Sequence, residues 1–109
     1  MVRDKDLHPI HPGEILREEL LKTYKLTPQQ LAKSIKVEER IIKELAKEQR
    51  DITPELSYRL GLYWGIREDY WLDLQKHYEL ECWKEQQELK KIVKQVQPNK
   101  YREKSIRNY

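Results

Sequence analysis

Four charged side chains near the middle of the chain have the chemistry to recognise nucleic-acid bases. They are Glu38, Glu39, Arg40 and Lys43, within the run VEERIIKEL at residues 37–45. An arginine or lysine can donate hydrogen bonds to guanine, and a glutamate can accept one from the amino group of cytosine. The two glutamates also have a structural explanation, because acids in the first turn of a helix interact favourably with its dipole. The residues themselves leave both explanations open.

Other groups around this run could hold the phosphates of a nucleic acid. The candidates are cationic side chains and the amides at the start of the preceding helix: Gln29, Gln30, Lys33, Lys36, Lys47 and Arg50. Helix N-termini and cations are common phosphate ligands. Residues 28–53 contain six cations and five acids, however, and six minus five leaves a net charge of +1. Since phosphate contacts supply most non-specific affinity, this balance predicts weak non-specific binding.

Catalytic and metal-binding chemistry has little support in the residue pattern. The three histidines, His8, His11 and His77, stand far apart, and no cluster of cysteines or acids has the spacing of metal ligands. Cys82 is the single cysteine, and we expect it to be packed and inert. No serine–histidine–aspartate or paired-carboxylate arrangement stands out. We therefore expect no enzymatic activity and no metal or cofactor.

The composition indicates one small, helical, intracellular domain. The chain has 109 residues, of which 38% are charged and 38% hydrophobic, with three glycines and no phenylalanine. Abundant Lys, Glu, Leu and Gln favour helices. The net charge of +3 is compatible with nucleic acid without being diagnostic. The single cysteine, the lack of a membrane-length apolar run and the polar N-terminus predict a cytoplasmic protein that does not bind membranes.

Start and stop signals divide the chain into five helices and predict an all-α fold. Apolar spacing, capping residues and prolines place them at about 13–23, 28–35, 38–46, 54–63 and from 67 onward. Thr27 and Thr53 each precede a proline and are expected to cap the second and fourth helices. Gly65 is well placed to end the fourth helix in the left-handed conformation.

The second and third helices have the apolar spacing of a helix-turn-helix. Inward positions on both would close a miniature core: Leu31, Ala32, Ile35, Val37, Ile42 and Leu45. Lys36 and Val37 would form the turn. In a DNA reader of this kind, the third helix enters the major groove and the second lies across the backbone. An ordinary helical hairpin has the same spacing, so the pattern alone does not decide between them.

The last helix is expected to continue to about residue 97, because no glycine or proline interrupts it before Pro98. A narrow apolar stripe late in this helix, with two aromatic residues near its start, is our candidate for a dimer or partner surface: Trp64, Tyr70, Leu89, Ile92, Val93 and Val96. A paired reader needs such a contact to hold its reading helices about 34 Å apart. The stripe could instead fold back onto its own domain.

The C-terminal segment carries the basic excess of the chain. Residues 84–109 contain eight cations and three acids, and eight minus three gives +5, more than the +3 of the whole chain. Residues 98–109 lack any apolar periodicity, so we expect them to be disordered. The segment could be a DNA-backbone arm, a contact for a protein partner or a solubilising tail.

Three separated blocks of the sequence resemble one protein family. They are HPGEILREELL at 11–21, LTPQQLAKSIKV at 26–37 and ITPELSYRLGLYWGIREDYWLDLQKHYEL at 52–80. In this order and spacing they resemble the HigA family of antitoxins, helix-turn-helix proteins of the Xre class that are also called virulence-associated protein I. The resemblance covers residues 8 to about 83.

The resemblance implies both a fold and a function. It implies a five-helix, lambda-repressor-like DNA-binding domain at residues 1–83, continued by an extended last helix at 84–97 and a basic tail at 98–109. It also implies a homodimer that binds palindromic double-stranded operator DNA and represses its own promoter. The implied protein partner is a small HigB-type ribonuclease toxin, which cleaves messenger RNA on ribosomes. The apolar stripe of the last helix could receive that toxin.

Several positions of the reading motif depart from the family pattern. Lys36 stands where the family often has glycine and would adopt the turn conformation under some strain. Glu38 and Glu39 replace a proline or serine followed by arginine, and Ile41 stands where an arginine is common. Glu48-Gln49-Arg50 replaces a Gly-Lys-Arg run and retains only its arginine. These departures raise an alternative, a toxin-neutralising interaction module whose specific DNA binding is weak or lost.

Overall fold

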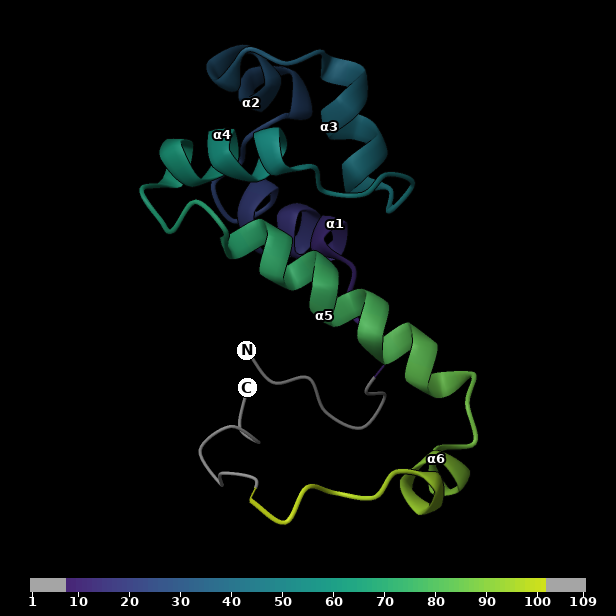
Figure 1. The fold of residues 1–109 in the computed structure, drawn as a ribbon. Coiled ribbons are helices and arrows are strands. Elements are labelled where there is room, and N and C mark those ends of the chain that lie inside the picture. The colour runs from purple at the N-terminus through teal and green to yellow at the C-terminus, as the bar shows by residue number, and fades with distance from the viewer. Residues whose placement is uncertain (1–7, 102–109) are drawn as a thin grey trace.

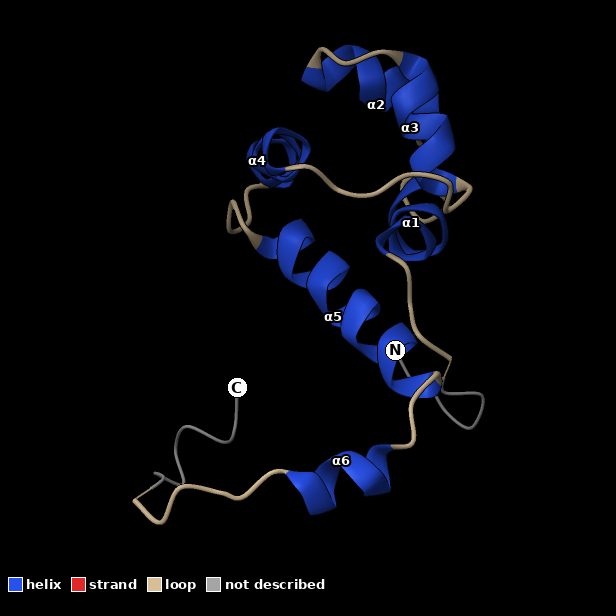
Figure 2. Ribbon diagram, turned by 45° about the vertical axis from the view of Figure 1, so that its right-hand side comes forward, coloured by secondary structure: helices blue, strands red, loops and turns tan. Residues whose placement is uncertain are grey.

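The computed structural model describes residues 8–101, and its helices form one group with a separate C-terminal helix. Helices α2 (Pro28–Ile35), α3 (Glu39–Ala46) and α4 (Pro54–Trp64) lie together at one end of the molecule (Figure 1). Helix α1 (Pro12–Ile15) continues directly into the π-helical segment η1 (Leu16–Leu21), and both pack between this group and α5 (Tyr70–Glu85). The short helix α6 (Leu89–Gln95) follows beyond the far end of α5 (Figure 2).

The all-α fold is confirmed, but residues 8–101 form six helices, counting α1 and η1 as one, where five were expected. The difference lies in the last helix, which does not run unbroken to residue 97. The amides of Gln86 and Gln87 donate to carbonyls three residues earlier, at 3.1 Å each, and this tighter spacing ends α5. Helix α6 buries no residue, so no packing sustains one long helix past the core. Most of the predicted tail, residues 102–109, lies outside the described residues.

The capping predictions are confirmed. The Thr27 hydroxyl accepts from the Gln30 amide at 3.1 Å, and the Gln30 side chain accepts from the Thr27 amide at 2.9 Å, which completes a capping box. The Thr53 hydroxyl accepts from the Leu56 amide at 3.2 Å. Gly65 ends α4 with a φ of 66° in the left-handed region. These local signals fix where α2 and α4 begin and where α4 ends.

One hydrophobic core joins all the helices before α6. Its fully buried side chains come from five elements: Leu16, Leu31, Ile42, Leu45, Leu60 and Trp71. Two buried polar side chains bond backbone groups at the edge of this core. Gln75 of α5 accepts from the Ile52 amide at 3.0 Å, and Ser57 of α4 donates to the Glu68 carbonyl at 2.7 Å. These bonds tie α5 to the loop before α4 and α4 to the turn before α5.

Helix α1 approaches the end of α3 very closely. A Cβ added to Gly13 would lie 1.8 Å from the Leu45 carbonyl oxygen, so only glycine allows this approach. Arg17 of η1 adds a second link, because its guanidinium donates to the Ala46 carbonyl and to Glu48, the latter at 3.1 Å. The position of α3 is therefore set from behind by α1 and η1, opposite its exposed face.

Two kinds of feature are absent from the described residues. Between residues 8 and 101, no helix is long and apolar enough to cross a membrane. In that range, no three or more His, Cys, Asp or Glu side chains are grouped so as to hold a metal ion.

Candidate nucleic-acid interface

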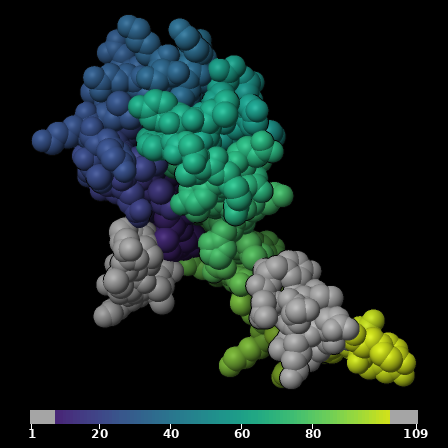
Figure 3. All heavy atoms as spheres, turned by 90° about the vertical axis from the view of Figure 1, so that its left-hand side faces the viewer, coloured from purple at the N-terminus to yellow at the C-terminus, as the bar shows by residue number. Residues whose placement is uncertain are grey.

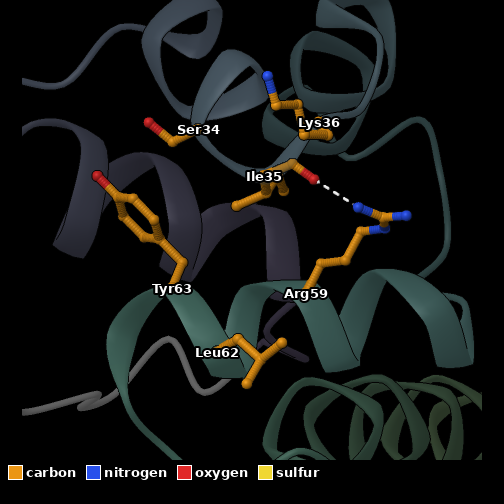
Figure 4. Close-up of a pocket in the computed structure, with 6 residues that line it drawn as sticks. All are labelled: Ser34, Ile35, Lys36, Arg59, Leu62 and Tyr63. Atoms are coloured by element: carbon orange, nitrogen blue, oxygen red, sulfur yellow. Dashed lines mark hydrogen bonds between the residues drawn. The ribbon is translucent and has the colours of Figure 1, made fainter.

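The turn between α2 and α3 has the geometry that a helix-turn-helix requires. Lys36 ends α2 with φ 61° and ψ 49°, in the left-handed region, as the resemblance implied. The Arg59 guanidinium of α4 donates to the Ile35 carbonyl at 2.8 Å and so satisfies one of the last carbonyls of α2 (Figure 4). Sequence reasoning did not find this role of Arg59, because the two residues are separated by all of α3.

Helix α3 begins one residue later than the predicted boundary. Glu38 precedes the helix as an extended residue, with φ −68° and ψ 141°, and its side chain makes no capping hydrogen bond. Glu39 is the first helical residue, with Ile42 and Leu45 buried on the inner face. The exposed face carries Arg40 in the first turn and Lys43 in the last turn, so three of the four candidate base-reading side chains lie at or just before the N-terminus of α3, and Lys43 lies one turn further along.

We call the exposed side of α3, together with Glu38, the reading face. Its cations are paired with acids from the same motif. Arg40 contacts Glu38 at 3.0 Å and Glu44 at 3.4 Å, and Lys43 contacts Glu39 at 2.8 Å. The hydrogen bond from Arg40 to Glu38 is the main reason that the pKa of Arg40 is raised. The reading face therefore consists of alternating charges and lacks a free positive cluster.

Glu44 is the acid that links the reading helix to the following loop. Arg50 donates to it through Nε at 3.1 Å and Nη2 at 2.9 Å, and this bonding is the main cause that lowers the pKa of Glu44. Glu44 was not among the predicted site residues, although its spacing of four from Arg40 was a usable signal. Its pairing with Arg50 depends on the path of the loop, which the spacing does not show.

The predicted phosphate ligands differ in how free they are. Within the described part of the chain, Lys33, Lys36 and Lys47 form no ion pair, whereas Arg50 is paired with Glu44. The Gln30 amide is already bonded to the Thr27 hydroxyl in the capping box. The neighbouring Gln29 amide, also in the first turn of α2, is the better placed of the two glutamine candidates.

Six of the ten predicted DNA-contact residues border three surface hollows, and the other four, Glu38, Gln29, Gln30 and Lys33, border none of these three. One of about 490 Å³ collects most of the reading face: Glu39, Arg40, Lys43, Glu44, Lys47 and Gln49. Arg50 borders a second hollow between α3 and α4, together with Val37 and Thr53. Lys36 borders a third with Arg59 and Tyr63 at the end of α2 (Figure 4). The reading face is thus contiguous, and the two outlying cations flank it.

The predicted partner residues do not form one surface. Trp64 and Tyr70 border a hollow beside η1, at the N-terminal end of α5. Leu89, Ile92, Val93 and Val96 lie on or next to α6, beyond the C-terminal end of α5 (Figure 1). These residues were predicted as one surface because a single helix was expected from residue 67 to about 97.

Comparison with known proteins identifies the family. No model of a protein family matches the chain. The chain is 44% identical over 75 residues to virulence-associated protein I of Dichelobacter nodosus, in an alignment covering 69% of each protein. It resembles a HigA-family addiction module antidote protein from Coxiella burnetii, at 35% identity and TM-score 0.73, over 85% of this chain and 100% of the other. The chain belongs to the HigA family of antitoxins.

A second HigA structure supports the same assignment. The Pseudomonas aeruginosa antitoxin HigA, solved with the higBA promoter, is 35% identical with a TM-score of 0.71, over 84% of this chain and 98% of that one. As a member of the HigA family, the chain has a helix-turn-helix in α2 and α3, and the alternative of an ordinary helical hairpin is excluded. These HigA relatives are named as antitoxins and not as enzymes.

Proposed function

We propose that this HigA-family antitoxin binds operator DNA as a dimer, represses its own promoter and neutralises a HigB-type toxin that cleaves messenger RNA. The observation that carries DNA binding is the exposed, hydrogen-bonding face of α3, held by a buried inner face and by the close contact with α1. The Pseudomonas relative that was solved with its promoter supports a DNA ligand for this face. Family membership alone supports the toxin partner.

The side chains divide into base-reading and phosphate-binding roles in this proposal. Glu38, Glu39 and Arg40 contact base edges, because they lie at the N-terminal end of the reading helix, and Lys43 does so from the next turn of the same exposed face. Phosphates are held by the groups that have no ion pair to break, namely Lys33, Lys36, Lys47 and the Gln29 amide. Arg40 and Lys43 must break their ion pairs with glutamates before they can contact a base. Each released glutamate can then accept a hydrogen bond from cytosine.

Promoter binding at several salt concentrations tests this proposal. The probe is a duplex of the region upstream of this chain's own reading frame, compared with a scrambled duplex of equal length. Replacing Lys43 with alanine should weaken specific binding about tenfold, because a base contact is lost. The matched control is Lys22→Ala. Lys22, at the C-terminal end of η1, pairs with Glu18 four residues earlier, just as Lys43 pairs with Glu39, and both pairs are exposed. Absence of sequence-specific binding at every moderate salt concentration would contradict the proposal.

A second candidate function is toxin neutralisation with little specific DNA binding. The pairing of Arg40 and Lys43 with acids favours it, because each paired cation must break an ion pair before it contacts DNA. Under this alternative, Glu38 and Glu39 serve only to interact favourably with the dipole of α3. Changing both to glutamine should then raise affinity for every duplex equally. A changed preference among duplexes would instead assign the two residues to base reading.

A further inference from the structure

Two exposed apolar surfaces among the described residues lie at opposite ends of α5. The first is a hollow of about 420 Å³ where η1 faces the junction of α4 and α5, which we call the corner hollow. Its apolar lining is Ile15, Leu20, Tyr24, Trp64, Ile66 and Tyr70. Tyr24 and Ile66 remain 64% and 41% exposed, so residues 8–101 leave part of the lining uncovered. A solvent-facing aromatic hollow of this kind indicates a binding surface.

The second surface is the apolar stripe of α6, formed by Leu89, Ile92, Val93 and Val96. These residues follow the i, i+3, i+4, i+7 spacing that places them on one side of a helix. Val93 and Val96 are 73% and 60% exposed, and α6 buries no residue. A seven-residue helix has little stability by itself, so the stripe needs an apolar partner to keep α6 folded.

The stripe cannot reach the corner hollow of its own chain. Tyr70 and Trp71 place the hollow at the first turn of α5, and the 16 residues of that helix span about 24 Å. Only residues 86–88 separate α5 from α6. If α6 folded back along α5, its seven residues would cover only about 10 Å of that length. Figure 3 shows the yellow C-terminal residues projecting away from the helical domain.

Opposite charges beside the two surfaces suit them to each other. Glu19 borders the corner hollow and forms no ion pair within residues 8–101, while Lys90, beside the stripe, is likewise unpaired there.

We propose that α6 of one protomer docks into the corner hollow of a second copy of this chain, and that the second copy's α6 returns the contact. One two-fold arrangement then covers both exposed surfaces of both protomers, as in a closed symmetric dimer. The inference deepens the dimer of the proposed function by naming its interface. The Glu19 carboxylate of one protomer faces Lys90 of its partner in this arrangement.

The oligomeric state of the full chain, measured by light scattering without DNA or toxin, tests this proposal. Wild type should be a dimer at micromolar concentration. Val93→Asp on the stripe and Ile66→Asp in the hollow should each raise the dissociation constant of the dimer at least tenfold and so shift the protein to monomer. The controls make the same kind of change nearby: Gln95→Asp on the other side of α6 and Leu62→Asp on the exposed face of α4 should leave the dimer intact. Circular dichroism of every variant shows that the domain remains folded.

Mixing the two monomeric variants separates reciprocal docking from other interfaces. A mixture retains one intact stripe and one intact hollow on different chains, so it should recover a heterodimer that neither variant forms alone. Loss of the dimer in Val93→Asp but not in Ile66→Asp would overturn the proposal in favour of pairing between two α6 helices. A wild-type monomer, or a dimer in both variants, would also overturn it and would leave the corner hollow to a toxin. Because no DNA is present, none of these outcomes decides operator binding.

Discussion

Among single residues, the helix-turn-helix combines favourable ion pairs with one unfavourable backbone conformation. The pairs Glu39–Lys43 and Arg40–Glu44 follow from a spacing of four on a helix and were accessible to sequence reasoning. Lys36 is the opposite case, because its side chain is a candidate phosphate ligand while its backbone is left-handed. That conformation is unfavourable for a residue with a Cβ, and the local fold imposes it.

Replacing Lys36 with glycine should stabilise the protein by about 1 kcal/mol, because glycine adopts the left-handed conformation without the steric penalty. Urea denaturation followed by circular dichroism measures the change. Lys36→Ala is the matched control, since it removes the same charge but keeps the Cβ, and it should give no such gain. Equal stabilisation by both variants would show that the charge and not the backbone is responsible. Both variants should weaken DNA binding alike.

At the scale of elements, α3 is positioned by a contact behind it and not by its own exposed residues. Gly13 brings α1 against the Leu45 carbonyl, and Arg17 bonds the carbonyl of Ala46. Neither contact is visible from helical periodicity, because each joins elements about thirty residues apart. The sequence did place Gly13 in a block that resembles the family, but it did not show why a glycine is needed there.

Gly13→Ala should therefore destabilise the fold by about 3 kcal/mol, since the added methyl group overlaps backbone atoms that have no room to move. Thermal and urea unfolding measure this loss. Gly65→Ala provides a comparison without overlap, because a Cβ there meets nothing within 4 Å and only the left-handed φ opposes it. It should lose about 1 kcal/mol. A Gly13→Ala variant as stable as Gly65→Ala would refute the close approach of α1 and α3.

In the whole molecule, His11 connects the start of α1 to α5. Its Nδ1 accepts from the Gly13 amide at 2.8 Å and caps α1, while its ring packs edge-on against Tyr78 of α5 with centroids 4.8 Å apart. Only 3% of its surface is exposed, and burial lowers the pKa of His11 below its ordinary value of 6.5. The bonded Nδ1 must be unprotonated, so the folded protein holds His11 neutral.

Stability should consequently fall as the pH decreases through 6.5. Above that pH His11 is neutral in both states; below it the unfolded chain takes up the proton first, and the loss continues until the pH passes the lower folded pKa. The measurement is the free energy of unfolding at pH 7.5 and pH 5. His11→Asn can still cap α1 but does not titrate, so its loss over this interval should be smaller than that of wild type. Equal losses would contradict the role of His11.

The amino-acid sequence was enough to place the first four helices, the helix-turn-helix among them, and to show the family resemblance. The Thr27 and Thr53 hydroxyls cap their helices, Pro28 fits a first turn, and Gly65 ends α4 in the left-handed conformation; each acts within a few residues of itself, so the sequence alone shows it. Tertiary structure alone decided the rest. It ended α5 at Glu85, joined Arg50 to Glu44, made Gly13 indispensable and separated Trp64 from the α6 stripe. The physical reason is that each of these depends on what packs against a segment, and packing partners are distant in the chain.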